Sequence, residues 1–351
     1  MSLRIINIGH FNLVKPKGTF MHSVAPKLSN GFIRNGHRVF DFSDRDMAMY
    51  FAPFSARQLG VPKANRLLRR LCAEIVPDLL VLGHADIIHP ETIAAIRRDH
   101  PHVRVLQWNV DPMFEPDNVA RICRKLDVVD ATLVSTAGEA LRPLARPGKL
   151  LGFFPNPVDF SIESGAAHTR LDLPFDLFCG AGSPSGTRII GGETISVDAL
   201  VTRIQQEIPG IRCKLGMVLN NPFLQGYPYQ SALSQSAIGI NISRRSDAFL
   251  YSSDRLAHMV GNGIATLIDR RTGYDQLFAE DALVFYNDIS EMIGHVRALI
   301  ADPARRAAIA AKGRARYHQL FNEQIIARYV VDAAFGTVRP EDYEWPSLVN
   351  F

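Results

Sequence analysis

The segment 252–263, SSDRLAHMVGNG, carries residue types that bind phosphate. Ser252, Ser253 and Asp254 precede an apolar run with helical spacing, which is typical of a helix N-terminus. The free backbone N–H groups and partial positive charge of such an end bind phosphate, and the guanidinium group of Arg255 adds donors. The same pattern is typical of an ordinary capped helix. We therefore predict a phosphate site here and keep the capped helix as the alternative.

Two more basic residues are placed where they could stabilise the charge that develops on a leaving phosphate. Arg188 follows a Gly-rich loop, GAGSPSG at 180–186, and Lys214 lies in the next expected strand. We predict a phosphate contact for both residues. The alternative for Arg188 is a solvated position in a surface loop.

Asp111 and His84 each fall just past the end of an expected strand in the first half of the chain. A carboxylate or a neutral imidazole there can act as a general base and take the proton of an attacking hydroxyl. We predict Asp111 as this base and His84 as the second candidate. Asp111 precedes Pro112, so a simple turn is its alternative role, and His84 could cap a strand end.

Apolar strands alternate with helical segments in both halves of the chain. In the first half we expect strands at 3–8, 37–42, 78–82, 103–108 and 131–135, and helices at 20–35, 67–75, 91–99 and 119–125. In the second half we expect strands at 175–179, 211–215, 237–242, 265–268 and 282–285, and helices at 197–206, 255–260, 291–300, 303–312 and 322–334. This alternation predicts βαβ units and parallel sheets that are covered on both faces.

The fold class that we predict is α/β, with two Rossmann-like domains facing each other across a cleft. Residues 1–152 would form the first domain and 175–335 the second, joined by a Pro-rich linker at 153–174. The tail at 336–351 could pack back on the first domain. Ligands of open parallel sheets bind at the carboxyl ends of the strands, so the loops there are where we expect the site.

The second half resembles the C-terminal half of GT-B glycosyltransferases, especially CgeB-like proteins near the family-4 transferases. The segments that carry this resemblance are AIGINIS (237–243), SDRLAHMVGNG (253–263), ATLID (265–269) and ALVFYND (282–288), followed by helices to about Arg328. The resemblance implies a diphosphate contact for Arg188 and a Ser-containing loop at Ser243. The glutamate that usually holds the donor ribose in this family is replaced here by His258.

The first half also resembles that group, in NGHRVFDF (35–42) and RVLQWNVDPMFEP (104–116). The resemblance implies a transferase that moves a sugar from a UDP-, GDP- or CMP-linked donor to a hydroxyl of a glycan or glycolipid, in bacterial envelope polysaccharide synthesis. It implies no required cofactor and no metal in the site. Two alternatives stay open: a nucleotide-sugar epimerase of the same fold, and a catalytically silent protein that binds sugar nucleotides.

Composition and short motifs bear on the partners, the location and the cofactor class that we expect for the protein. The net charge of +4 over 351 residues is mild, and without a basic arm or a nucleic-acid motif we expect no nucleic-acid partner. The four cysteines lack CxxC spacing and the N-terminus lacks a signal sequence, so we expect a cytoplasmic protein.

The basic amphipathic segment 64–75 is either a helix packed on the sheet or a peripheral contact with the inner membrane surface. The loop after the first strand, GHFNLVKPKG, lacks the GxGxxG pattern of a dinucleotide-dependent dehydrogenase.

Overall fold

The computed structural model describes residues 2–14, 18–53 and 56–348. The chain divides into two compact units, 1–157 with 322–351 and 158–321. Each unit contains a parallel sheet, and we describe the two units separately.

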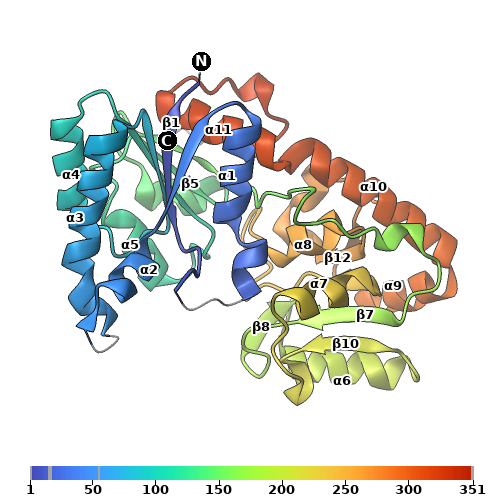
Figure 1. Ribbon diagram of the computed structural model, residues 1–351. Helices are drawn as coiled ribbons and strands as arrows, with labels where there is room; N and C mark the ends of the chain where they lie inside the picture. The colour runs from blue at the N-terminus through green and yellow to red at the C-terminus, as the bar shows by residue number, and fades with distance from the viewer. Residues whose placement is uncertain (1, 15–17, 54–55, 349–351) are drawn as a thin grey trace. The chain divides into compact units, whose positions relative to one another are not determined.

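The first unit is built on a six-stranded sheet in the order β2-β1-β3-β4-β5-β6, in which every pair is parallel. Its strands are β1 (Arg4–Gly9), β2 (Arg38–Ser43), β3 (Leu79–Gly83), β4 (Arg104–Asn109), β5 (Ala131–Val134) and β6 (Leu150–Phe153). Its helices are α1 (Val24–Arg34), α2 (Asp44–Tyr50), α3 (Arg57–Ile75), α4 (Pro90–Asp99), α5 (Pro116–Cys123) and α11 (Glu323–Phe335). Figure 1 shows α3 and α4 on one face of this sheet and α1 with α11 on the other. The strands β3 and β5 are buried along their whole length, as a sheet covered on both faces requires.

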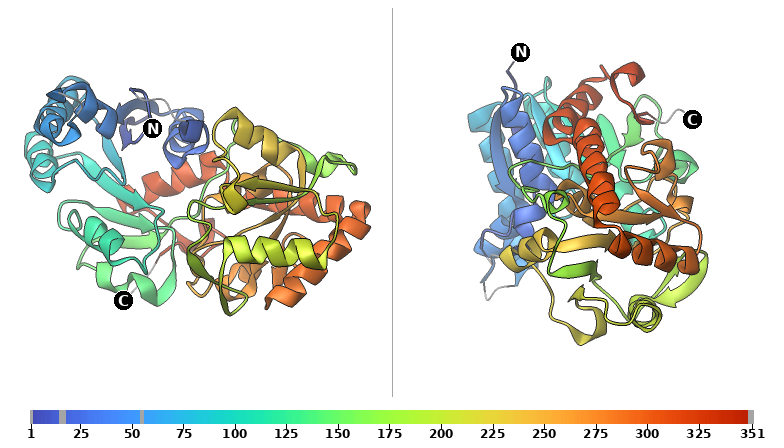
Figure 2. Two further views of the ribbon diagram at one scale, coloured as in Figure 1. Left: turned by 90° about the horizontal axis from the view of Figure 1, so that it is seen from below. Right: turned by 90° about the vertical axis from the view of Figure 1, so that its right-hand side faces the viewer.

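The second unit has a five-stranded parallel sheet in the order β10-β7-β11-β12-β13 and a separate antiparallel hairpin, β8–β9. Its strands are β7 (Phe175–Gly180), β8 (Thr187–Ile190), β9 (Glu193–Ser196), β10 (Cys213–Gly216), β11 (Ser236–Ile240), β12 (Ala265–Asp269) and β13 (Val284–Tyr286). Its helices are α6 (Val197–Glu207), α7 (Tyr227–Ser234), α8 (Arg255–Gly261), α9 (Ile289–Ala301) and α10 (Pro303–Phe321). Figure 2 shows helices on both faces of the sheet. Both units are therefore Rossmann-like, as the alternation of strands and helices predicted.

The bounds of the units differ from the expected domain bounds at two places. The first part of the stretch expected as a linker is packed: Phe153 and Phe154 are fully buried, as is Val158 at the start of the second unit. The helix α11, expected in the second domain, belongs to the first unit and packs against α1. A Cβ atom on Gly31 of α1 would lie 2.0 Å from the backbone oxygen of Glu323, so the two helices approach as closely as glycine permits.

The tail after α11 packs on the first sheet. Leu348 forms an antiparallel bridge with Gly152 of β6, and the Tyr329 hydroxyl of α11 donates to the backbone oxygen of Ser347. Tyr343 and Trp345 cover Tyr329 with ring centroids 4.9 and 5.6 Å away. The tail thus completes the apolar covering of the unit in which the chain begins.

Candidate functional site

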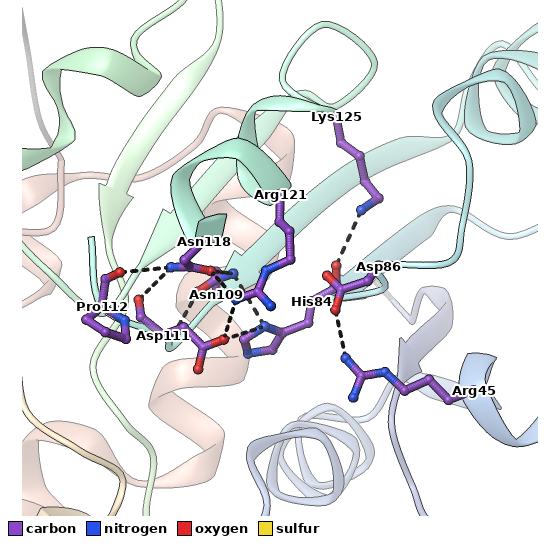
Figure 3. Close-up of polar contacts among 9 residues, drawn as sticks. All are labelled: Arg45, His84, Asp86, Asn109, Asp111, Pro112, Asn118, Arg121 and Lys125. Atoms are coloured by element: carbon purple, nitrogen blue, oxygen red, sulfur yellow. Dashed lines mark hydrogen bonds and ion pairs between the residues drawn. The ribbon is translucent and has the colours of Figure 1, made fainter. Parts of the chain in front are cut away.

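The carboxyl edge of the first sheet brings the two predicted catalytic residues together. His84 follows β3 and Asp111 follows β4, and these strands are neighbours in the sheet. The Nδ1 atom of His84 lies 3.6 Å from Oδ2 of Asp111 (Figure 3). His84 and the next residue, Ala85, have φ angles of 56° and 43°, a left-handed conformation that costs energy in non-glycine residues and clusters at functional sites.

A polar network fixes the position of Asp111 (Figure 3). Arg121 of α5 donates to Asp111 Oδ2 at 3.0 Å, and the backbone N–H of Asp111 donates to Asn109 Oδ1 at 2.8 Å. Asn118 donates to the backbone oxygens of Asp111 and Pro112 at 2.9 and 3.2 Å. The side chain of Asp111 is still 45% exposed, so its carboxylate is accessible to a ligand.

The same network sets the tautomer of His84. The Asn109 amide is oriented by two bonds: Oδ1 accepts from Asp111, and Nδ2 donates to Asn118 Oδ1 at 2.9 Å. The second hydrogen on Nδ2 therefore faces His84 Nδ1, 3.3 Å away. Burial, above all, lowers the pKa of His84, against the opposing effect of Asp111 and Asp86. A neutral ring that accepts at Nδ1 carries its proton on Nε2, so it can donate to a ligand there but cannot act as a base at that atom.

Further charged residues, some of them buried, lie beside His84 (Figure 3). Arg45 and Asp86 form an ion pair of 2.7 Å, and buried Lys125 donates to the backbone oxygen of His84 at 3.4 Å. Asp44 is 1% exposed, and its Oδ2 has no hydrogen-bond partner among the described residues. Burial raises the pKa of Asp44 to about 6, although Arg45 and Lys125 act in the opposite direction.

The raised pKa of Asp44 predicts how the stability of the protein depends on pH. From pH 4 to 6 the folded chain keeps a proton that the unfolded chain has lost, so the free energy of unfolding falls as pH rises through this window. A shift of about two units corresponds to about 3 kcal/mol. Asp44→Asn should remove this part of the pH dependence in urea unfolding, whereas Asp127→Asn, at a position 89% exposed, should keep it. An unchanged slope in Asp44→Asn would show that Asp44 is ionised in the folded protein throughout.

The second unit gathers arginines at the carboxyl edge of its sheet. Arg188 projects from the hairpin strand β8 and is only 7% exposed, and Arg255 opens α8. Burial lowers the pKa of Arg188 most, and the neighbouring guanidinium groups of Arg255 and Arg244 lower it further. Arg188, Arg244 and Arg255 thus form a cluster of like charges, which we call the arginine cluster.

Several donors in and beside the arginine cluster are unused. The Nε atoms of Arg188 and Arg255 and the Oγ atom of Ser243 are buried and have no hydrogen-bond partner among the described residues. One other nitrogen of each guanidinium group is anchored: Nη2 of Arg188 donates to the backbone oxygen of Ser183 at 3.2 Å, and Nη2 of Arg255 donates to that of Ile242 at 2.9 Å. Buried donors without partners carry a desolvation cost that a bound anion would remove.

The predicted cap at 252–254 is not formed as expected. Asp254 occupies the N-cap position of α8 with φ −55° and ψ −21° and makes no side-chain capping bond, and α8 has only seven residues. Ser252 is fully buried, and its hydroxyl lies 2.9 Å from that of Tyr274. Ser253 donates to Asn241 Oδ1 at 3.2 Å. The serines therefore tie this loop to the core, and the positive charge of the site comes from the arginine cluster.

Two other predicted donor residues lie in different surroundings. Lys214 of β10 places its ammonium group over the ring of Phe175, 5.2 Å from the centroid. Phe175 begins β7 while Lys214 is in register with Phe178, so the side chain turns toward the amino end of the sheet. His258 is buried in α8, with Nδ1 3.0 Å from the hydroxyl of Tyr229. Among the residues predicted to bind the donor, Arg188, Ser243 and Arg255 lie in or beside the arginine cluster.

Sequence reasoning missed the hairpin that carries Arg188. Residues 187–196 read TRIIGGETIS, two short β-prone runs around Gly-Gly, which is a hairpin signal. Gly191 and Gly192 have φ angles of 57° and 78°, as a type I′ turn requires. Sequence analysis also did not predict the network around Asp111, which is formed by Asn109, Asn118 and Arg121. Nothing in the spacing of these residues distinguishes them from surface residues.

Comparisons with known proteins bear on the family and on the fold. Residues 196–331 match a family model described as glycosyl transferase-like. This part of the chain is therefore similar to that family. No curated protein matches the chain by sequence.

Solved structures share the fold of this chain at low sequence identity. Sucrose-phosphate synthase from Thermosynechococcus elongatus aligns with a TM-score of 0.63 at 12% identity, over 95% of this chain and 98% of that one. Anabaena HepE in complex with UDP-glucose aligns with a TM-score of 0.58 at 12% identity, over 95% and 100%. A putative UDP-N-acetylglucosamine 2-epimerase from Listeria monocytogenes gives 0.52 at 12% identity, over 98% and 99%. These likenesses confirm the predicted GT-B fold.

Proposed function

We propose that this protein is a glycosyltransferase of the GT-B class. It binds a nucleoside diphosphate sugar on its second unit, with the diphosphate held by the arginine cluster. The observation that carries the proposal is the set of buried, unused donors on Arg188, Arg255 and Ser243, where guanidinium groups lie beside one another. A diphosphate supplies both the negative charge and the acceptor oxygens that these groups lack. UDP is the first nucleotide to test, because the GT-B neighbour HepE is solved with UDP and with UDP-glucose.

We propose that the first unit supplies the base. The Asp111 carboxylate would take the proton of an acceptor hydroxyl, whose oxygen then bonds to the anomeric carbon of the sugar. As this bond forms, the bond from the sugar to the diphosphate breaks, and the arginine cluster stabilises the charge left on the nucleoside diphosphate. His84 would donate from Nε2 to the acceptor and orient it. We propose no metal or other cofactor for this step.

A glycan or glycolipid of a bacterial envelope is the acceptor that we propose. Among the residues that the structure describes, no helix combines the length and apolar character needed to cross a bilayer. The exposed face of α3 carries Arg57, Lys63, Arg66, Arg69 and Arg70, with Glu74 as an exposed acid on the same helix. Leu59 of this helix is 59% exposed. Such a basic face suits peripheral contact with an anionic membrane on the cytoplasmic side, where glycolipid acceptors would be found.

The membrane contact predicts selective binding to anionic vesicles. The protein should sediment with vesicles containing phosphatidylglycerol and not with pure phosphatidylcholine. Neutralising Lys63, Arg66 and Arg70 to Gln should weaken this binding by about 100-fold, since each surface cation contributes about 1 kcal/mol. Equal binding of the wild type and the triple variant would show that α3 does not face the membrane.

The experiment that tests the proposed function is a thermal-shift screen with UDP, GDP, CMP and dTDP, followed by product analysis. A nucleotide that binds the folded protein raises the melting temperature with ln(1 + [L]/Kd). The matching nucleotide sugar should then give a glycosylated product only when an acceptor is present. Turnover of the donor without acceptor would instead support an epimerase, a function that the fold of the Listeria neighbour also allows. Binding without turnover in either assay would support a silent binding protein.

A further inference from the structure

Hydrogen bonds attach the hairpin β8–β9 to other parts of the second unit along its side and at its turn. Along its side, the backbone N–H of Ile189 donates to Arg244 O at 3.2 Å, and Ser246 Oγ donates to Ile189 O at 3.0 Å. At its turn, the backbone N–H of Gly191 donates to Oδ2 of Asp269 at 2.8 Å. Arg188 lies directly before Ile189 and three residues before Gly191.

Asp269 is a buried carboxylate at the carboxyl end of β12, with 2% of its surface exposed. Its Oδ1 accepts the backbone N–H of Arg271 at 3.0 Å and pairs with the Arg271 guanidinium at 3.1 Å. Arg271 is held in turn by the backbone oxygen of Asn287, at 2.7 Å. Because each oxygen of Asp269 has a separate partner, its Oδ2 is directed at the hairpin turn.

The turn at Gly191 and Gly192 packs closely against the residues around it. A Cβ atom on Gly191 would lie 2.9 Å from the backbone of Asp288 and Ile289, and one on Gly192 would lie 3.0 Å from the Arg271 guanidinium. Both glycines also have positive φ angles that other residues adopt only with strain. The turn therefore packs closely against the backbone of Asp288 and Ile289 and against the Arg271 side chain.

Arg188 needs such an anchor because its surroundings repel it. Its side chain lies beside Arg255 and Arg244, and a two-stranded hairpin is only marginally stable when left to itself. We infer that Asp269 is a positioning residue, which holds the β8–β9 hairpin through Gly191 and so keeps Arg188 in the arginine cluster. This inference rests on the proposed binding of diphosphate at that cluster.

A double-mutant cycle with Arg188 tests the inference, with inorganic pyrophosphate and UDP as probes in isothermal titration calorimetry. Asp269→Asn should raise the Kd of both probes about tenfold, a coupling within the range seen for residues in one network. In an Arg188→Ala background the same substitution should have no further effect, because the group that it positions is gone. Gly191→Ala should reproduce the effect of Asp269→Asn by displacing the turn.

The controls separate this result from general loss of stability. Asp159, a buried acid of the same unit, bonds Ser161 instead of the hairpin, so Asp159→Asn should lower the melting temperature without changing either Kd. Equal effects of Asp269→Asn with and without Arg188 would overturn the positioning role, as would an unchanged Kd in Asp269→Asn. If Arg188→Ala alone leaves both Kd values unchanged, it is the proposed donor site that fails.

Discussion

Arg188→Ala is expected to raise the Kd of UDP about 10- to 100-fold, because hydrogen bonds to charged groups contribute about 1.5–3 kcal/mol. The melting temperature of the unliganded variant should stay the same or rise. Arg188 is a buried cation with like charges as neighbours, so its removal relieves repulsion. Calorimetry with UDP and thermal unfolding of the free protein measure the two quantities.

Arg245→Ala is the matched control for this prediction. Arg245 lies one residue beyond Arg244, is exposed, and is paired with Asp247 at 2.6 Å. Its loss should change neither UDP binding nor stability by much, since exposed ion pairs contribute about 0–1 kcal/mol. A large fall in melting temperature in Arg188→Ala together with unchanged UDP affinity would assign Arg188 a structural role. Weak affinity with unimpaired stability is the signature of a residue kept for ligand binding.

Asp111→Asn is expected to lower kcat about 100- to 10,000-fold, the range that general bases contribute, with little change in the KM of the donor. Asparagine keeps the shape of the side chain and still bonds Arg121 through its carbonyl oxygen, but it cannot take a proton. Steady-state kinetics with the nucleotide sugar found in the thermal-shift screen measures both constants. Asp117→Asn, an exposed acid in the first turn of α5, provides the control.

His84→Gln separates the two candidates for the base. The network leaves His84 with a proton on Nε2, so its loss should affect acceptor binding more than the chemical step. A larger fall in kcat for His84→Gln than for Asp111→Asn would reverse the assignment and make the imidazole the base. Activity that survives both substitutions would indicate a mechanism without a protein base.

The strands and their order along the chain could be predicted because short, wholly apolar runs have few alternatives. The segments around Leu79–Gly83 and Ala131–Val134 are buried on both faces, and this burial is visible in composition alone. The convergence of His84 and Asp111 followed from the same reasoning, since adjacent parallel strands end at the same edge. The local apolar pattern was therefore sufficient to predict those strands whose formation depends on burial alone.

The remaining features depend on tertiary contacts that local pattern does not encode. The membership of α11 in the first unit is set by the close approach of Gly31 to Glu323, nearly 300 residues away along the chain. The residues 252–254 have the composition of a helix cap, but Ser252 and Ser253 bond Tyr274 and Asn241 instead. Lys214 lies in a predicted strand, and only the ring of Phe175 shows in which direction its side chain turns.

A crystal structure of the protein with bound UDP tests the central claim most directly. We predict that the diphosphate oxygens lie within hydrogen-bond distance of Nε of Arg188 and Nε of Arg255, with Ser243 Oγ as a further donor. A polar cavity of about 440 Å³ in the first unit is lined by Arg328, Asp332, Thr337, Arg339 and Asp342. Diphosphate density in that cavity, or anywhere else away from the arginine cluster, would contradict the assignment of the donor site.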